Sequence, residues 1–199
     1  GSGAGICVNA ATDYGFDAMG IEPSERAVKL SKKTYSVNVS CDLLRADDDL
    51  PRDFGILTLW DVIEHVSDPE ELVKNCAMHL AEGGCLVLET PDEGAFIRTV
   101  IRRLSTLSRM LDLRGNMYYR AHRYYFTTTA MRKLLERCGF EEVKFYKERT
   151  MYEKALLMAQ MFRGTAGLKL VTLKSVFWLL KRLPFSENKM VVVARKATS

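Results

Sequence analysis

The sequence predicts an α/β fold built on a doubly wound, mostly parallel sheet. Segments with the apolar pattern of strands alternate with segments of helical pattern over most of residues 1–146, as crossover connections between parallel strands require. Two strand segments, 54–60 (FGILTLW) and 85–89 (CLVLE), are continuous apolar runs, which are typical of strands buried on both faces. A turn with glycines at positions 1, 3 and 5 opens the chain and leads into a helical segment.

The composition favours a single domain without a nucleic-acid partner. The 199 residues fall within the size of one domain, and 47% apolar residues suffice for a core. A net charge of +4 is too small for a nucleic-acid-binding face. No signal peptide or long uncharged apolar segment is visible, so we expect a cytoplasmic protein. The five cysteines contain no C-x-x-C pair and predict buried free thiols in a reducing compartment: Cys7, Cys41, Cys76, Cys85 and Cys138.

The N-terminal part is expected to contain two helices and two short strands. A helix over 6–13 ends at a Tyr-Gly break, and an apolar strand over 16–21 follows it. Ser24 is a typical N-cap for a helix over 25–33. A second short strand is predicted over 37–40.

The middle of the chain repeats the alternation of strand and helix after an acidic loop. The strand over 54–60 is followed by a helix whose start is marked by Asp68 as N-cap and Pro69 in the first turn. This helix is expected to reach about Leu80 and to stop at the Gly-Gly pair that precedes the strand over 85–89.

The second half of the chain is less regular. A basic helix is predicted over 96–109, and a loop rich in Arg and Tyr follows it. Thr127 or Thr128 is expected to cap a helix that ends at a Cys-Gly pair. The remaining predicted elements are a strand over 141–146, helices over 152–162 and 168–183, and a strand over 190–194.

The glycine turn and the acid after the next strand together predict a nucleoside site. Glycines let backbone N–H groups approach a ligand closely, and Glu22 can accept hydrogen bonds from both hydroxyls of a ribose. The spacing is G-x-G-x-G rather than the dinucleotide fingerprint G-x-G-x-x-G, because Gly5 comes one residue early and Ile6 holds the sixth position. This spacing argues against a nicotinamide oxidoreductase, and an ordinary glycine turn is the alternative interpretation.

Five segments together resemble the class I S-adenosylmethionine (SAM) methyltransferases. They occur in the order that the family shows and cover most of residues 1–146: GSGAG, GIEPS, LWDVIEHVSDP, LAEGGCLVLETPD and HRYYFTTTAMRKLLERCGF. The chain is most similar to the ubiquinone-biosynthesis O-methyltransferases and related bacterial small-molecule methyltransferases. The resemblance implies a Rossmann-like fold, SAM as cofactor and a small-molecule acceptor, methylated at a hydroxyl oxygen. It also implies one domain over 1–199, with 93–126 as an acceptor-side insert and 150–185 as a helical C-terminal region.

The resemblance assigns cofactor roles to the matching positions. These positions are Gly1, Gly3, Gly5, Glu22, Asp42, Leu43, Trp60 and Asp61. The glycines would surround the methionine part and the ribose, whose hydroxyls Glu22 would bind. Asp42 would accept a hydrogen bond from the adenine amine, with Leu43 packed on the ring, although a solvated loop acid is the alternative for Asp42. Asp61 and its neighbours would border the methyl-transfer centre.

Candidate catalytic and metal-binding residues follow the strand over 54–60. Asp61, Glu64 and His65 form D-x-x-E-H, and the resemblance suggests that such a set binds a divalent ion that holds a catechol-like acceptor. Carboxylates and imidazole are reasonable ligands for such an ion. The alternative is that Glu64 and His65 only cap and pack a short helix. Asp61 and His65 are also candidates for a direct part in catalysis, whereas His79 lies within a predicted helix and is interpreted as structural.

His122 is the candidate base. It comes just before the run Tyr-Tyr-Phe-Thr, where the resemblance places a histidine. A neutral imidazole there could accept the proton of an acceptor hydroxyl near neutral pH. We expect Tyr118 and Arg123 to be its neighbours in the acceptor pocket. The alternative is that His122 hydrogen-bonds the backbone and holds the loop in place.

The predicted helix over 168–183 is amphipathic, with basic residues on one side and apolar residues on the other. It is too short and too charged to span a bilayer, but it could contact a membrane surface. Packing on its own sheet or on a dimer partner is the alternative, and the sequence does not determine the oligomeric state.

The chain opens directly on Gly1, whereas the family has an apolar strand immediately before the first glycine. We therefore expect the natural protein to continue upstream with a helix and an apolar strand. Since that strand is absent here and the base is uncertain, a catalytically silent SAM-fold binding or scaffold module is the second hypothesis for the function.

Overall fold

The computed structural model describes residues 1–45, 49–103, 121–148 and 187–198, and it has the predicted α/β architecture. In spatial order, the strands of the larger sheet are β3 (Phe54–Trp60), β4 (Leu80–Pro91), β6 (Lys189–Lys196) and β5 (Phe140–Glu148). β3 and β4 are parallel, and β6 is antiparallel to both of its neighbours. Three of the four described strands of this sheet, β3, β4 and β5, therefore run in the same direction and β6 runs opposite to them, which agrees with the predicted mostly parallel sheet.

Helices α3 (Pro69–His79) and α7 (Thr128–Arg137) pack against one face of the larger sheet. Their side chains Val73 and Leu135 are fully buried in one cluster with Leu86 and Leu88 of β4. Both helices begin where the sequence indicates, because Asp68 accepts hydrogen bonds from two backbone N–H groups of the first turn of α3 and Thr127 caps α7. This core supports the end of the sheet that carries the candidate site.

The N-terminal layer contains α1 (Ile6–Asp13), β1 (Gly20–Ile21), α2 (Glu25–Tyr35) and β2 (Val39–Ser40). Ser24 caps α2 as predicted, and its hydroxyl accepts a hydrogen bond from the backbone of Ala27. The two strands are shorter than expected, because β1 and β2 pair in parallel over two residues each. Phe16, which was expected to begin a strand, is 58% exposed.

Burial of β3 on both faces is a prediction that the structure corrects. Leu59 is buried in the core, but Ile56 and Trp60 on the opposite face are 54% and 38% exposed. β3 forms one edge of the larger sheet, and α3 and α7 cover the face that Leu59 joins. An apolar run therefore indicated a strand here without indicating how many of its faces are covered.

The transition from α3 to β4 also differs from the prediction. The helix ends at His79, and β4 begins at once with Leu80, so the Gly-Gly pair lies inside the strand. Phe54 pairs with Leu80 and Ile56 with Cys85, which leaves an irregular bulge between the two pairs. A Cβ at Gly84 would lie 3.0 Å from the Phe54 carbonyl oxygen, so the bulge requires a residue without a side chain there.

The C-terminal elements are α4 (Phe96–Arg103), α7, β5 and β6. β5 and β6 are longer than predicted because they pair with each other in antiparallel fashion from Phe140↔Lys196 to Glu148↔Lys189. The predicted helices over 152–162 and 168–183, and the end of the helix predicted over 96–109, lie outside the described residues. No helix among the described residues is both long and apolar enough to cross a membrane.

The cysteines are free, as predicted, but they are not all buried. Cys76 and Cys138 lie in the core, whereas Cys7 and Cys41 are exposed. In α1 only Val8 is buried, so the neighbouring Cys7 faces away from the small apolar cluster that Val8 forms with α2 and β2. Burial of a thiol therefore depends on which side of its element is covered.

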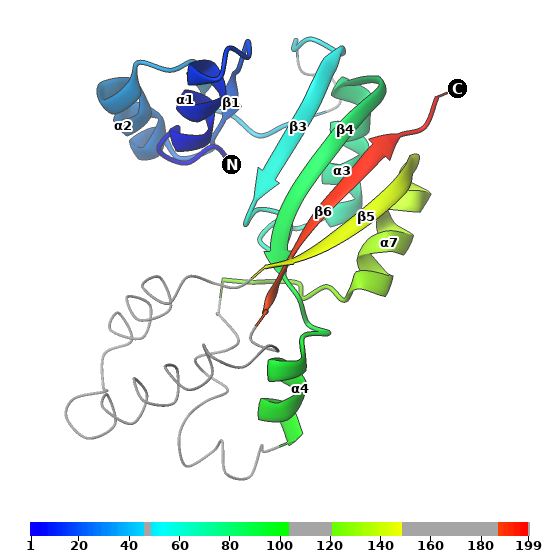
Figure 1. Ribbon diagram of the computed structural model, residues 1–199. Helices are drawn as coiled ribbons and strands as arrows, with labels where there is room; N and C mark the ends of the chain where they lie inside the picture. Colours follow the sequence, from blue (N-terminus) through cyan, green and yellow to red (C-terminus); the bar gives the residue numbers. More distant parts are fainter. Residues whose placement is uncertain (46–48, 104–120, 149–186, 199) are drawn as a thin grey trace, which may run out of the picture.

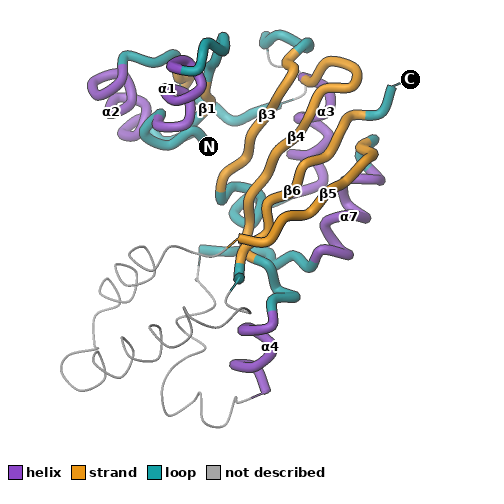
Figure 2. The backbone as a smooth tube through the Cα atoms, viewed as in Figure 1, coloured by secondary structure: helices purple, strands orange, loops and turns teal. Residues whose placement is uncertain are grey.

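The two sheets lie next to each other without a shared ladder between described strands, as Figures 1 and 2 show. The amide of Ser2 donates to the Ile21 carbonyl at the end of β1, and a Cβ on Gly1 would collide with Val62 just after β3. The first residues of the chain therefore lie between the carboxyl ends of β1 and β3.

Among the described strands, β1 and β3 each pair with a strand on one side only, and Ile56 and Trp60 of β3 are exposed. We therefore expect residues 1–199 to unfold with low cooperativity and to turn over poorly. Thermal unfolding followed by circular dichroism, with an activity assay on the same sample, tests this expectation. A sharp cooperative transition together with full activity contradicts this expectation.

Candidate active site

The candidate residues follow the carboxyl ends of the parallel strands. Glu22 follows β1, Asp61 follows β3 and Asp92 follows β4. In open α/β sheets this edge is where ligands bind, because helix N-termini and the loops after the strands meet there. The site is described below from the cofactor side to the acceptor side.

The glycine turn leaves the first backbone N–H groups of α1 without a side-chain cap. Gly3 and Gly5 have φ angles of 53° and 83°, in the left-handed region that favours glycine. A Cβ at Gly5 would lie 2.8 Å from side-chain atoms of Ser31 and Val37, so α2 and the chain before β2 approach the turn closely. No side chain caps the first turn of α1, whose backbone N–H groups can therefore bind an anionic group such as a carboxylate.

Glu22 joins the glycine turn to the start of α2. Its Oε2 accepts a hydrogen bond from the Gly3 amide at 2.9 Å, and its Oε1 accepts one from the Ser24 amide at 3.0 Å. Each carboxylate oxygen can accept a second hydrogen bond. The carboxylate is thus held in place with acceptor capacity left for two hydroxyl groups.

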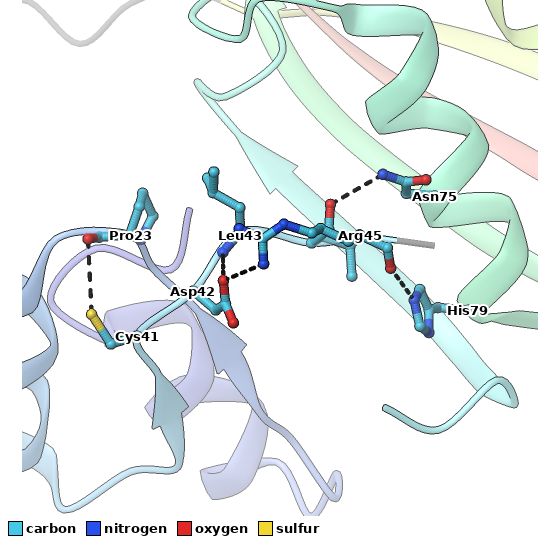
Figure 3. Close-up of polar contacts among 8 residues, drawn as sticks. Pro23, Cys41, Asp42, Leu43, Arg45, Asn75 and His79 are labelled. Carbon is cyan, nitrogen blue, oxygen red and sulfur yellow. Dashed lines mark hydrogen bonds and ion pairs between the residues drawn. The ribbon is translucent and has the colours of Figure 1, made fainter. Parts of the chain in front are cut away.

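Asp42 lies in the loop after β2. Its Oδ1 accepts hydrogen bonds from the Leu43 amide at 2.7 Å and from the Arg45 guanidinium at 2.8 Å. The bond from Leu43, followed by the bond from Arg45, lowers the pKa of Asp42, so this exposed carboxyl is ionised at neutral pH. Leu43 is 53% exposed and offers an apolar surface beside it. Figure 3 shows this loop against α3.

Asp61 is bound by a lysine that no sequence motif indicated. Both of its carboxylate oxygens accept hydrogen bonds from Lys189 Nζ, at 2.7 and 2.8 Å, and the same ammonium contacts Glu89. Burial alone would lower the pKa of Lys189, but the bonds to Asp61 and Glu89 raise it, so the ammonium is charged. Asp61 has a φ angle of 51°, and its amide donates to the Glu89 carbonyl. Hydrogen bonds of both the carboxylate and the amide therefore fix the position of Asp61.

Glu64 is a fully buried carboxyl next to this ion pair. Its Oε2 accepts a hydrogen bond from the Thr90 hydroxyl at 3.0 Å, while its Oε1 has no hydrogen-bond partner among the described residues. Burial raises the pKa of Glu64, and the bond from Thr90 offsets part of the rise. Its main-chain carbonyl accepts hydrogen bonds from the Arg123 and Tyr124 amides, which holds the His122 loop against this turn.

His65 and His122 face each other beside Glu64. Their ring centroids are 4.6 Å apart with the planes nearly perpendicular, and the Tyr125 ring centroid lies 5.4 Å from that of His122. His65 Nδ1 lies 3.0 Å from the Ala121 carbonyl oxygen, which can only accept, so this nitrogen donates the hydrogen bond. Burial, followed by the charge of His65, lowers the pKa of His122 to about 4, so its ring is neutral at neutral pH.

A candidate metal-binding group exists here, but it differs from the predicted set. One ligand atom each from Glu64, His65 and His122 lie within 4.8 Å of one another. Asp61 is not part of this group, because Lys189 binds both of its oxygens. Among the described residues, the potential ligands of a divalent ion are the Glu64 Oε1, which has no hydrogen-bond partner there, and the imidazoles of His65 and His122. His122 thus takes the role that the resemblance gave to Asp61.

Two further cationic groups lie near the site and were missed from the sequence. Lys189 begins β6, whose antiparallel register places it opposite Pro91 at the end of β4. Arg98 of α4 pairs with Glu93 at 3.2 Å and lies 5.1 Å from the Tyr125 ring centroid. No spacing rule indicates either residue, although a lone lysine at the start of an apolar strand is an unusual position. Tyr118, which was expected beside His122, lies outside the described residues.

Comparison with known proteins gives the family. A family described as "Methyltransferase domain" matches residues 1–144. The ubiquinone biosynthesis O-methyltransferase of Coxiella burnetii (strain Dugway) is 29% identical over 109 residues, which cover 51% of this chain and 46% of that protein. The corresponding protein of Thiobacillus denitrificans is 33% identical over 101 residues, covering 48% and 44%. The chain thus matches less than half the length of these relatives.

A solved structure supports the fold. The SAM dependent methyltransferase from Archaeoglobus fulgidus superposes with a TM-score of 0.62 at 18% identity, covering 98% of this chain and 83% of that one. With the family match over residues 1–144, this similarity shows that the chain belongs to the methyltransferase domain family and has the Rossmann-like fold of class I SAM-dependent methyltransferases.

Proposed function

We propose that this protein transfers the methyl group of SAM to a hydroxyl oxygen of a small-molecule acceptor. The observation that carries the proposal is the Glu22 carboxylate, held by the Gly3 and Ser24 amides beside the open N-terminus of α1. The helix terminus suits the carboxylate of the methionine part, and Glu22 suits the two ribose hydroxyls. Asp42 is ionised, as an acceptor for the adenine amine requires.

Methyl transfer is an in-line displacement, so the main task of the protein is to position the reactants. The bond between the SAM sulfur and the methyl carbon breaks and its electron pair stays on sulfur, while the acceptor oxygen forms the new bond to carbon. The acceptor must also lose the proton of its hydroxyl. The loop that carries His122 lies against the turn that follows β3, because the Arg123 and Tyr124 amides donate to the Glu64 carbonyl. We place the acceptor beside this loop.

His122 is the residue that we propose as base or orienting group. Its neutral ring can accept a hydrogen bond or a proton from the acceptor hydroxyl. The carboxylate of Asp61 raises the proton affinity of His122 and so offsets part of the effect of burial. In this arrangement the His65 ring packs against His122, and Asp61 supplies a negative charge nearby.

A divalent ion bound by Glu64, His65 and His122 is the competing arrangement on the acceptor side. Such an ion would polarise the acceptor hydroxyl and lower its pKa. The two roles of His122 exclude each other, because a metal ion occupies the lone pair that a base needs. Metal dependence of the rate therefore distinguishes them.

The proposed function is tested first at Glu22. Charge-assisted hydrogen bonds contribute roughly 1.5–3 kcal/mol each, so we expect Glu22→Ala to weaken SAM binding by at least about tenfold. Isothermal titration calorimetry on the full-length protein measures this effect. Glu25→Ala is the matched control, because Glu25 is an exposed acid in the first turn of α2 that pairs only weakly with Lys29. Unchanged affinity in a folded Glu22→Ala variant, or preference for NAD over SAM, contradicts the proposal.

A further inference from the structure

The loop that carries Asp42 has no strand or helix of its own, and two buried side chains of α3 hold it. Asn75 Nδ2 donates to the Leu44 carbonyl at 3.1 Å, and His79 Nε2 lies within hydrogen-bond distance of the Arg45 carbonyl oxygen, at 2.9 Å. The other ring nitrogen of His79 lies 3.0 Å from the Pro51 carbonyl. Figure 3 shows Asn75 and His79 on the same side of α3, facing the loop.

Asn75 and His79 are four residues apart, so they lie one turn apart on one helix face. Both are buried, with 6% and 0% of their surface exposed, although each bears polar atoms. A buried polar group is costly unless it is hydrogen-bonded, and here the partners are main-chain carbonyls of a loop. The same contacts therefore satisfy the helix side chains and fix the path of the loop.

Arg45 connects these contacts to Asp42. Its carbonyl oxygen contacts His79 Nε2, and its guanidinium donates to Asp42 Oδ1. Leu43, between them, donates its amide to the same oxygen. The position of the Asp42 carboxylate is thus determined through the backbone of 43–45, which α3 holds at two successive carbonyls.

We propose that Asn75 and His79 are positioning residues for the adenine ring of SAM, acting through the loop over 42–45. This inference rests on the proposed function, in which Asp42 accepts a hydrogen bond from the adenine amine. If α3 releases the loop, Asp42 loses its fixed position, and the protein loses the ability to distinguish adenine from a base that lacks the amine. The effect is on recognition of the base, not on the methyl-transfer step.

The experiment compares the affinity for SAM with the affinity for its analogue in which hypoxanthine replaces adenine. We expect the full-length protein to prefer SAM by about tenfold, as one hydrogen bond to a charged group allows. His79→Leu and Asn75→Leu, which keep the volume but remove the donors, should reduce this preference to about twofold or less. Turnover at saturating SAM should change by no more than about threefold. His79→Gln keeps one donor and should restore part of the preference.

Met78→Ala is the control, because Met78 lies on the same helix and is 40% exposed. Hydrogen exchange of the 42–45 amides in the ligand-free protein is a second measurement, and exchange should quicken in both leucine variants. A purely structural role would weaken both ligands equally and leave the preference intact, which overturns the inference. Equal binding of both ligands by the unaltered protein overturns it too, whereas no binding of SAM at all overturns the proposed function itself.

Discussion

Replacing His122 with alanine should lower turnover by about a hundredfold or more while leaving SAM affinity nearly unchanged, since general-base catalysis contributes about 10²–10⁴-fold. The reason is that we propose His122, whose ring contacts those of His65 and Tyr125, as part of the acceptor side, whereas we propose the glycine turn for SAM. Steady-state rates and SAM binding should be measured on the same preparation. Loss of both together indicates a structural role, and loss of neither removes His122 from the site.

The pH profile adds a second readout for His122. An ordinary histidine with a pKa near 6.5 would be protonated at pH 5 and could not act as base. Burial lowers the pKa of His122 to about 4, so the neutral ring persists at pH 5 and activity that depends on it should persist too. An acid limb near pH 6.5 contradicts this assignment.

The competing metal arrangement makes a different prediction, which is tested on the unaltered protein. If Glu64, His65 and His122 bind a divalent ion, then a chelator should abolish turnover in the unaltered protein and added Mn²⁺ should restore it. If His122 is the base, chelation should leave the rate unchanged. Glu136→Ala is a suitable control for both experiments, because Glu136 is exposed on α7.

Replacing Lys189 with methionine should lower the free energy of unfolding by about 3 kcal/mol, the lower end of what breaking a buried pair costs. The substitution keeps the aliphatic length but leaves Asp61 and Glu89 without the ammonium that joins them. The side chains of Lys189 and Glu89 are only 11% and 14% exposed, so water solvates the unpaired Glu89 carboxylate poorly. Urea unfolding followed by fluorescence measures the difference.

Two comparisons separate loss of charge pairing from loss of packing in Lys189→Met. Adding Asp61→Asn and Glu89→Gln should recover much of the lost stability, since the unpaired carboxylates are then neutral. Lys144→Met is the control on the neighbouring strand, because Lys144 is exposed. A stability deficit that these two neutralising substitutions do not rescue contradicts the electrostatic explanation.

Features that depend on near neighbours in the chain were predictable from the sequence. Ser24 and Asp68 cap their helices through N–H groups two or three residues away, so the cap is encoded locally. The turn at Gly5 needs a left-handed backbone, which glycine adopts readily. The same holds for the alternation of strand and helix patterns, and for Glu22 at the end of β1.

Features that depend on distant segments were decided only by the tertiary structure. Lys189 reaches Asp61 across 128 positions, and the pairing exists because β6 is antiparallel to β4. His79 and the Arg45 carbonyl are likewise distant in sequence, and nothing in the helix pattern indicated that contact. The apolar run of β3 predicted a strand, but its exposed face follows from its place at the sheet edge. Sequence periodicity reports which residues share a face of one element, whereas the packing of elements determines what each face meets.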